Sequence, residues 1–160
     1  MGTRRSTVQE LAAVGAAVGL DVRLRAFPAG DALRDAGQQR LLGRLHTRCH
    51  PSLGWATEVA IRINGDRRAW DALITGARWR IGVEAETVLD DLQAVERRLS
   101  LKERDGDVDH VILLVADTRR NRLALAAGDA AFACLNGDPR MILAALAAGQ
   151  EPTSSAIVVL

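Results

Sequence analysis

The chain has 160 residues, of which 48% are hydrophobic and 26% are charged, and its formal net charge is +1. This length suits one domain with a substantial core, and this composition excludes disordered and collagen-like chains. No apolar run approaches the roughly 18 residues of a membrane span, and the start MGTRRSTVQE lacks the apolar stretch of a secretory signal. Two cysteines, Cys49 and Cys134, are too few for a disulfide framework. The expected location is therefore a reducing cytoplasm.

Charge is distributed unevenly along the chain. Residues 1–50 hold eight arginines and four acidic residues, whereas residues 51–160 hold thirteen basic and sixteen acidic residues. A polyanion such as nucleic acid would therefore contact the first third in preference to the rest. A solvated helix face accounts for the same arginines without any partner.

The first part of the chain alternates between helical and strand patterns. Ser6 and Gln9 form a capping box ahead of apolar residues at helical spacing. Asn64-Gly65 is a strong signal for a hairpin turn between two strands. The elements expected here are a helix over about 7–18, a strand over 21–27, a helix over 33–47 and a strand over 57–63.

The second part continues the alternation. Thr87 can cap a helix whose core line would be Val88, Leu92, Val95 and Leu99. The near-continuous apolar run over 111–116 is typical of a strand that is covered on both faces. The other elements expected are strands over 70–74 and 79–86, a helix over 119–127, a strand over 132–135, a helix bracketed by Asp138-Pro139 and Gly149, and a strand over 156–160. We therefore predict an α/β fold with a mixed central sheet flanked by helices.

Three carboxylates interrupt the two strands of the expected hairpin around Gly76-Ala77. Successive side chains of a strand point to opposite faces, so Trp70, Ala72 and Ile74 should share one face and Asp71 should lie on the other. On the next strand, Glu84 and Glu86 share a face. Pairing of the strands would bring the three carboxylates to one cleft at a sheet end.

Such a cluster normally holds a cation or a shared proton, because carboxylates at close range raise one another's pKa. Oxygen-only ligands suit magnesium or manganese, so the metal expected on Asp71, Glu84 and Glu86 is one of these two. The alternative is that all three carboxylates are solvated and pair with the neighbouring arginines. Those arginines are Arg67, Arg68, Arg78 and Arg80.

A second set of metal-ligand types lies at the end of the helix over 33–47. His46, Cys49 and His50 stand at i, i+3 and i+4 and could meet on one helix face. Only three ligands are present and Pro51 follows at once, so a helix end is the preferred interpretation. No glycine-rich phosphate loop is found.

The hairpin, its acidic strand pair, the following helix and the buried strand resemble the core of the restriction-endonuclease-like superfamily, whose motif is written PD-(D/E)XK. The resemblance implies that Asp71 and Glu84 bind the metal, and it places Glu86 where the family has a lysine that activates water. It also implies that Gln93 and Arg97 of the following helix overhang the cleft, and that Arg97 or Lys102 replaces the missing positive charge.

A second resemblance covers nearly the whole chain. Residues 6–20, STVQELAAVGAAVGL, resemble the last helix of an XRE-type helix-turn-helix domain, and segments such as DHVILLVADTRRNR resemble the domain that follows it in actinobacterial regulators. This implies a helix-turn-helix remnant over 1–20 and a restriction-endonuclease-like α/β domain over 21–160. It also implies a cytoplasmic homodimer that associates with nucleic acid and not with membranes. No recognition helix is present, so reading of a major groove by that motif is not expected.

Two functions follow as hypotheses. One is a nuclease-like, non-catalytic domain of a DNA-associated transcriptional regulator, which the glutamate at the lysine position favours. The other is an active nuclease that uses magnesium or manganese to cleave phosphodiester bonds.

Overall fold

A computed structural model describes residues 8–19, 32–63, 65–128 and 132–160. The chain divides into two units, Met1–Ala32 and Leu33–Leu160. In the first unit, helix α1 spans Val8–Ala17, which confirms the first predicted helix. A turn after the helix leads to Gly19, which adopts a φ of +77°. The predicted strand over 21–27, the Ser6 cap and the expected domain boundary at residue 20 lie outside the described residues.

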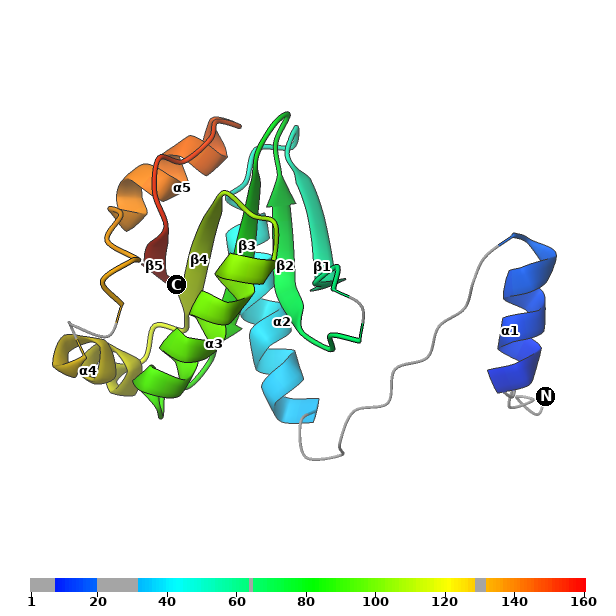
Figure 1. The fold of residues 1–160 in the computed structure, drawn as a ribbon, viewed down its shortest axis with the longest axis horizontal. Helices are drawn as coiled ribbons and strands as arrows, with labels where there is room; N and C mark the ends of the chain where they lie inside the picture. Colours follow the sequence, from blue (N-terminus) through cyan, green and yellow to red (C-terminus); the bar gives the residue numbers. More distant parts are fainter. Residues whose placement is uncertain (1–7, 20–31, 64, 129–131) are drawn as a thin grey trace, which may run out of the picture. The chain divides into compact units, whose positions relative to one another are not determined.

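The second unit is built on a five-stranded sheet with the order β1-β2-β3-β4-β5 (Figure 1). The first three strands pair antiparallel, and β4 and β5 then continue the sheet in parallel with β3. The prediction of an α/β fold with a mixed sheet is therefore confirmed. The strands are β1 (Gly54–Ala60), β2 (Ala69–Thr75), β3 (Arg80–Glu86), β4 (His110–Val115) and β5 (Ala156–Val159).

Helices cover both faces of the sheet, as Figure 1 shows for α2 and α3. Buried leucines of α2 and apolar residues of α5 share one core cluster with β2, β3, β4 and β5. The second cluster, on the other face, joins α3 and part of α4 to β2, β4 and β5. Among the described residues, no helix has both the length and the apolar character needed to cross a membrane. The helices are α2 (Ala32–His46), α3 (Leu92–Asp105), α4 (Arg119–Ala127) and α5 (Pro139–Ala147).

The β1–β2 hairpin changes faces part of the way along. Ala72 packs in the cluster under α2, whereas Trp70 packs in the cluster under α3, so the prediction that both share a face is wrong. On β1, Trp55 and Val59 are divided between the same two clusters. The cause is local, because Glu58 has a φ of +54° and so breaks the alternation of an extended strand.

The face change carries Trp70 onto Gly82 of the neighbouring strand. A Cβ atom at Gly82 would lie 2.5 Å from Cε2 of Trp70, so only glycine leaves room for the indole ring. Trp70 is itself 1% exposed. Trp70 thereby forms part of the apolar surface on which α3 packs.

Three further sequence predictions differ from the structure. Helix α3 begins at Leu92 because the Asp91 side chain accepts from the Ala94 N–H, so Thr87 is not its cap. Residues 132–135 form a turn closed by the Leu135 N–H and the Phe132 carbonyl, and not a strand. Strand β1 begins and ends three residues before the predicted range, so Ile63, the last residue of that range, lies beyond the strand and is exposed.

Asn121, in the first turn of α4, forms hydrogen bonds to the segment that follows β3. Its side chain is fully buried, with an exposed fraction of 0%. The Oδ1 atom accepts from the Leu89 N–H at 2.9 Å, and the Nδ2 group donates to the carbonyls of Thr87 and Ala116. One amide therefore bonds to three backbone groups near the ends of β3 and β4, of which the Ala116 carbonyl also accepts from the Thr118 N–H.

We predict that Asn121→Ala lowers the free energy of unfolding by about 2 to 4 kcal/mol, because buried backbone groups lose their partners. Urea denaturation followed by circular dichroism measures the change. Asn136→Ala is the matched control, because Asn136 is exposed, and it should shift stability by less than about 0.5 kcal/mol. Equal effects of the two substitutions would contradict this role of Asn121.

Candidate functional site

The predicted carboxylate cluster lies where the pairing of β2 and β3 ends. The last paired residues are Ala72 and Val83, and one further step of the same register puts Asp71 opposite Glu84. Here the Oδ2 atom of Asp71 accepts from the Ala85 N–H at 2.7 Å. A side chain thus replaces the backbone acceptor, and the Asp71 carboxyl group is held against β3.

Glu84 is buried beneath α3 and each of its oxygens has a cationic partner. Its exposed fraction is 5%. Oε1 accepts from Nε of Arg98 at 2.9 Å, and Oε2 accepts from Nζ of Lys102 at 2.5 Å. A buried carboxylate requires such partners, because an unpaired charge in the interior is strongly disfavoured.

Lys102 is equally buried, with an exposed fraction of 5%. In addition to Glu84, its ammonium group donates to the Ala69 carbonyl at 2.6 Å and lies 5.7 Å from the centre of the Trp70 ring. Its other two neighbours are thus a carbonyl and an aromatic face, both of which favour a cation. Lys102 therefore ties α3 to both β2 and β3.

Arg98 joins the two glutamates of β3. While its Nε binds Glu84, its Nη2 forms an ion pair with Oε1 of Glu86. Burial disfavours the charge of Arg98, but the charges of Glu84 and Glu86 and their hydrogen bonds outweigh it and raise the pKa of the guanidinium. The predicted alternative, in which arginines of the strands pair with the carboxylates, does not describe these ion pairs, since the cations bound to the two glutamates, Arg98 and Lys102, come from α3.

Asp71 is the carboxyl group with the strongly altered acidity. Burial, followed by the charge of Glu84, raises its pKa from 3.8 to about 7. The Ala85 N–H and the charge of Lys102 oppose this change, and the charge of Glu58 adds to it. A protonated Asp71 leaves two glutamates facing two cations, which is a balanced set. Near neutral pH the cluster therefore gains or loses one proton at Asp71.

The structure brings Lys102 to the cluster as predicted, but not the other two helical residues. Gln93 and Arg97 are exposed, and helical spacing puts them on the side of α3 opposite Val95. The expectation that they overhang the cleft is wrong. Arg98, one residue further on, takes the place expected for Arg97, and its position beside the buried line of Val95 and Lys102 is the signal that could have identified it.

The histidine and cysteine set at the end of α2 does not form a metal site. His46 stacks on Trp55 with ring centres 4.5 Å apart, the Cys49 thiol donates to the Leu45 carbonyl, and His50 bonds to Ser52. Within the described ranges, no group of three or more histidine, cysteine or acidic side chains is arranged to hold a metal.

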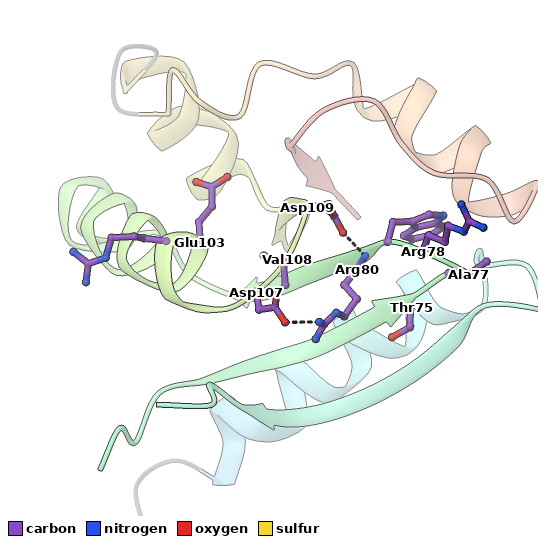
Figure 2. Close-up of a pocket in the computed structure, with 11 residues that line it drawn as sticks. Thr75, Ala77, Arg78, Arg80, Glu103, Asp107, Val108 and Asp109 are labelled. Atoms are coloured by element: carbon purple, nitrogen blue, oxygen red, sulfur yellow. Dashed lines mark hydrogen bonds and ion pairs between the residues drawn. The ribbon is translucent and has the colours of Figure 1, made fainter. Parts of the chain in front are cut away.

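A charged hollow lies at the other end of the β2–β3 hairpin, with a volume of about 520 Å³. Figure 2 shows Arg80 there between two aspartates: its guanidinium pairs with Asp107, and its backbone N–H donates to Asp109 at 2.8 Å. None of the predicted site residues lines this hollow. The carboxylate cluster and the hollow are therefore separate features.

Comparison with known proteins adds no further assignment. No protein-family model, curated protein or solved structure matched the chain.

Lys102→Met should lower the free energy of unfolding by about 3 to 5 kcal/mol, because Glu84 would remain buried with only one cation. The double variant Glu84→Gln/Lys102→Met should recover part of this loss, since it removes both charges. Chemical denaturation of both variants and the parent measures the coupling. Arg97→Met, a substitution on the exposed side of the same helix, serves as the control, and a loss as large as that of Lys102→Met would rule out the buried pair as the cause.

The raised pKa of Asp71 makes stability depend on pH. The folded protein holds this proton more tightly than the unfolded chain, so the stability it contributes is complete below the unfolded pKa and is lost as pH rises through about 7. Asp71→Asn keeps an acceptor for the Ala85 N–H. We expect it to exceed the parent in stability by about 2 to 4 kcal/mol at pH 8, with the difference shrinking toward pH 4.

Urea titrations at several pH values test this expectation. Asp138→Asn is the control, because Asp138 caps α5 at an exposed position. A stability difference between Asp71→Asn and the parent that stays constant from pH 4 to pH 8 would refute the assignment.

Proposed function

We propose that the chain is a nuclease-like, non-catalytic domain of a DNA-associated transcriptional regulator, with a restriction-endonuclease-like core. The observation that carries the proposal is the closed charge balance at Glu84, where Arg98 and Lys102 occupy both carboxylate oxygens. The order of elements also supports it, since an antiparallel acidic hairpin is followed by α3 and by the parallel strand β4.

The cluster as it stands is a poor fit for a divalent metal. Its oxygen donors are of the type that magnesium and manganese prefer. However, Glu84 and Glu86 already bind cationic side chains, and Asp71 accepts a backbone hydrogen bond with one oxygen. A metal would have to displace at least one buried or half-buried cation, at the cost of an ion pair in a dry environment. The site therefore resembles a nuclease centre whose metal position is filled by protein charges.

One observation favours the second candidate, an active nuclease that depends on magnesium or manganese. Lys102 contacts Glu84, so α3 supplies next to the carboxylates the positive charge that Glu86 cannot supply from β3. A cation in this position could stabilise a deprotonated water. The two candidate functions therefore share the same arrangement of residues and differ in whether phosphodiester bonds are cleaved.

A cleavage assay separates the two candidates. The purified protein is incubated with single- and double-stranded DNA and RNA in magnesium or manganese, beside Asp71→Asn and Lys102→Gln. We expect no cleavage by the parent above the level of either variant, because the carboxylates are already neutralised. Calorimetric titration with manganese should likewise give no heat of binding at micromolar metal.

Metal-dependent cleavage by the parent that both substitutions abolish would overturn the non-catalytic assignment and establish the nuclease. Circular dichroism of each variant is required alongside, so that loss of folding is not mistaken for loss of a catalytic group. Arg97→Gln, on the exposed side of α3, is the matched control and should behave as the parent does.

A further inference from the structure

Three arginines form a line along one side of α2 and the turn that follows it. Arg40 and Arg44 are exposed on the helix, and Arg48 is exposed just after its last residue. The chain keeps turning after the helix, since the Thr47 N–H donates to the Gly43 carbonyl at 3.0 Å and the Arg48 N–H to the Leu45 carbonyl at 2.9 Å, so Arg48 follows Arg44 after one tightened turn. We refer to these three residues as the arginine ridge.

Among the described residues the ridge has no ion-pair partner, as is true of several other arginines, and it differs from them in placing three such charges along one helix and the turn that follows it. From Ala36 to His50 the sequence contains neither aspartate nor glutamate. Within the described residues, no ion pair involves a member of the ridge, whereas six other arginines pair with carboxylates. Such clustered positive charge without compensation is unfavourable unless counterions or a polyanion neutralise it.

Asp117, whose pKa is affected by the charge of Arg44, is already neutralised by Arg122. Asp117 follows β4 and binds both Nε and Nη2 of Arg122, at 2.5 and 2.7 Å. These hydrogen bonds are the main cause of its lowered pKa, and the charge of Arg44 contributes as well. Asp117 therefore does not balance the charge of Arg44, because Arg122 already binds both of its carboxylate oxygens.

The length of the ridge is sufficient for several phosphates of one nucleic-acid strand. Positions four residues apart on a helix are separated by about 6 Å along its axis, so three of them cover about 12 Å. Phosphates of one strand of duplex DNA follow one another at about 3.4 Å along the duplex axis. The ridge can thus contact two or three phosphates of one strand, and the planar guanidinium group suits their oxygens.

We propose that the arginine ridge of α2 binds the phosphodiester backbone of nucleic acid without regard to base sequence. The inference rests on the nucleic-acid association in the proposed function and names the surface that provides it. It does not involve the carboxylate cluster, which lies on the α3 side of the sheet. Sequence independence follows because arginine–phosphate contacts position a protein on a strand but do not read the bases.

Fluorescence anisotropy with labelled duplex and single-stranded DNA of two unrelated sequences tests the proposal. The ridge variant is Arg40→Gln/Arg44→Gln/Arg48→Gln. The control, Arg62→Gln/Arg67→Gln/Arg78→Gln, removes the same charge from three exposed arginines at the ends of the two hairpins. Titrations from low to moderate salt give the slope of log affinity against log salt concentration for each protein.

The ridge variant should bind at least about tenfold more weakly at low salt and lose about 2 to 3 from the salt slope, one for each phosphate contact. The control should retain most of the parent's affinity, and both DNA sequences should behave alike. Circular dichroism establishes that both variants are folded.

Equal losses in both variants, or no loss in either, would overturn the ridge as the binding surface but leave nucleic-acid association intact. Absence of DNA binding by the parent would overturn both the inference and the nucleic-acid part of the proposed function. Binding to vesicles of phosphatidylcholine and phosphatidylserine, with none to DNA, would replace the nucleic-acid partner with an anionic lipid surface.

Discussion

The pair between Glu84 and Lys102 is the interaction on which the second unit depends. It is placed beneath α3 and joins that helix to β3, while the Ala69 carbonyl joins the same ammonium group to β2. A buried ion pair is weak evidence for stability, because its desolvation can equal its attraction. We interpret it instead as a constraint on position, since α3 cannot shift along the sheet without leaving both charges unpaired. The chain contains twenty arginines and Lys102 is its single lysine. A compact ammonium group fits between a carboxylate, a carbonyl and an indole ring, where a planar guanidinium would not.

Asp71 shows how the same arrangement limits chemistry. It stands at the level where β2 and β3 cease to pair, and its carboxyl group supplies the hydrogen bond that the ladder would otherwise provide. Around it, the three carboxyl groups face two cations. Protonation of Asp71 balances the set, whereas ionisation leaves one negative charge that a metal or a further cation could neutralise. A site that is satisfied by its own side chains gains stability and loses its capacity to bind a cation. Catalysis with a metal would require that at least one of the ion pairs of Glu84 and Glu86 break.

Sequence patterns were sufficient for elements with strong local signals. The buried strand β4, the helix α4 and the capped helix α5 match their predicted ranges closely, because apolar runs and capping residues act locally. The side on which Trp70 packs could not be predicted, since it depends on the positive φ of Glu58 on another strand. The choice between Arg97 and Arg98 failed for a different reason. The predicted core positions Val95 and Leu99 are buried, but neighbouring helical side chains point about 100° apart, and the resemblance selected Arg97 on the exposed side in place of Arg98 beside Val95.

On the two faces of the sheet in the second unit, two groups of cationic side chains differ in whether they are paired with carboxylates. On the α3 side, Arg98 and Lys102 are bound to glutamates, so their fields largely cancel at short range. On the α2 side, the arginine ridge keeps its charge exposed, and Asp117 is neutralised by Arg122. Exposed charges act over about 10 Å at moderate salt. Under the proposed function, a polyanion would therefore be attracted toward α2 and not toward the carboxylate cluster. Association with nucleic acid and its cleavage would then be separable, and the first would not require the second.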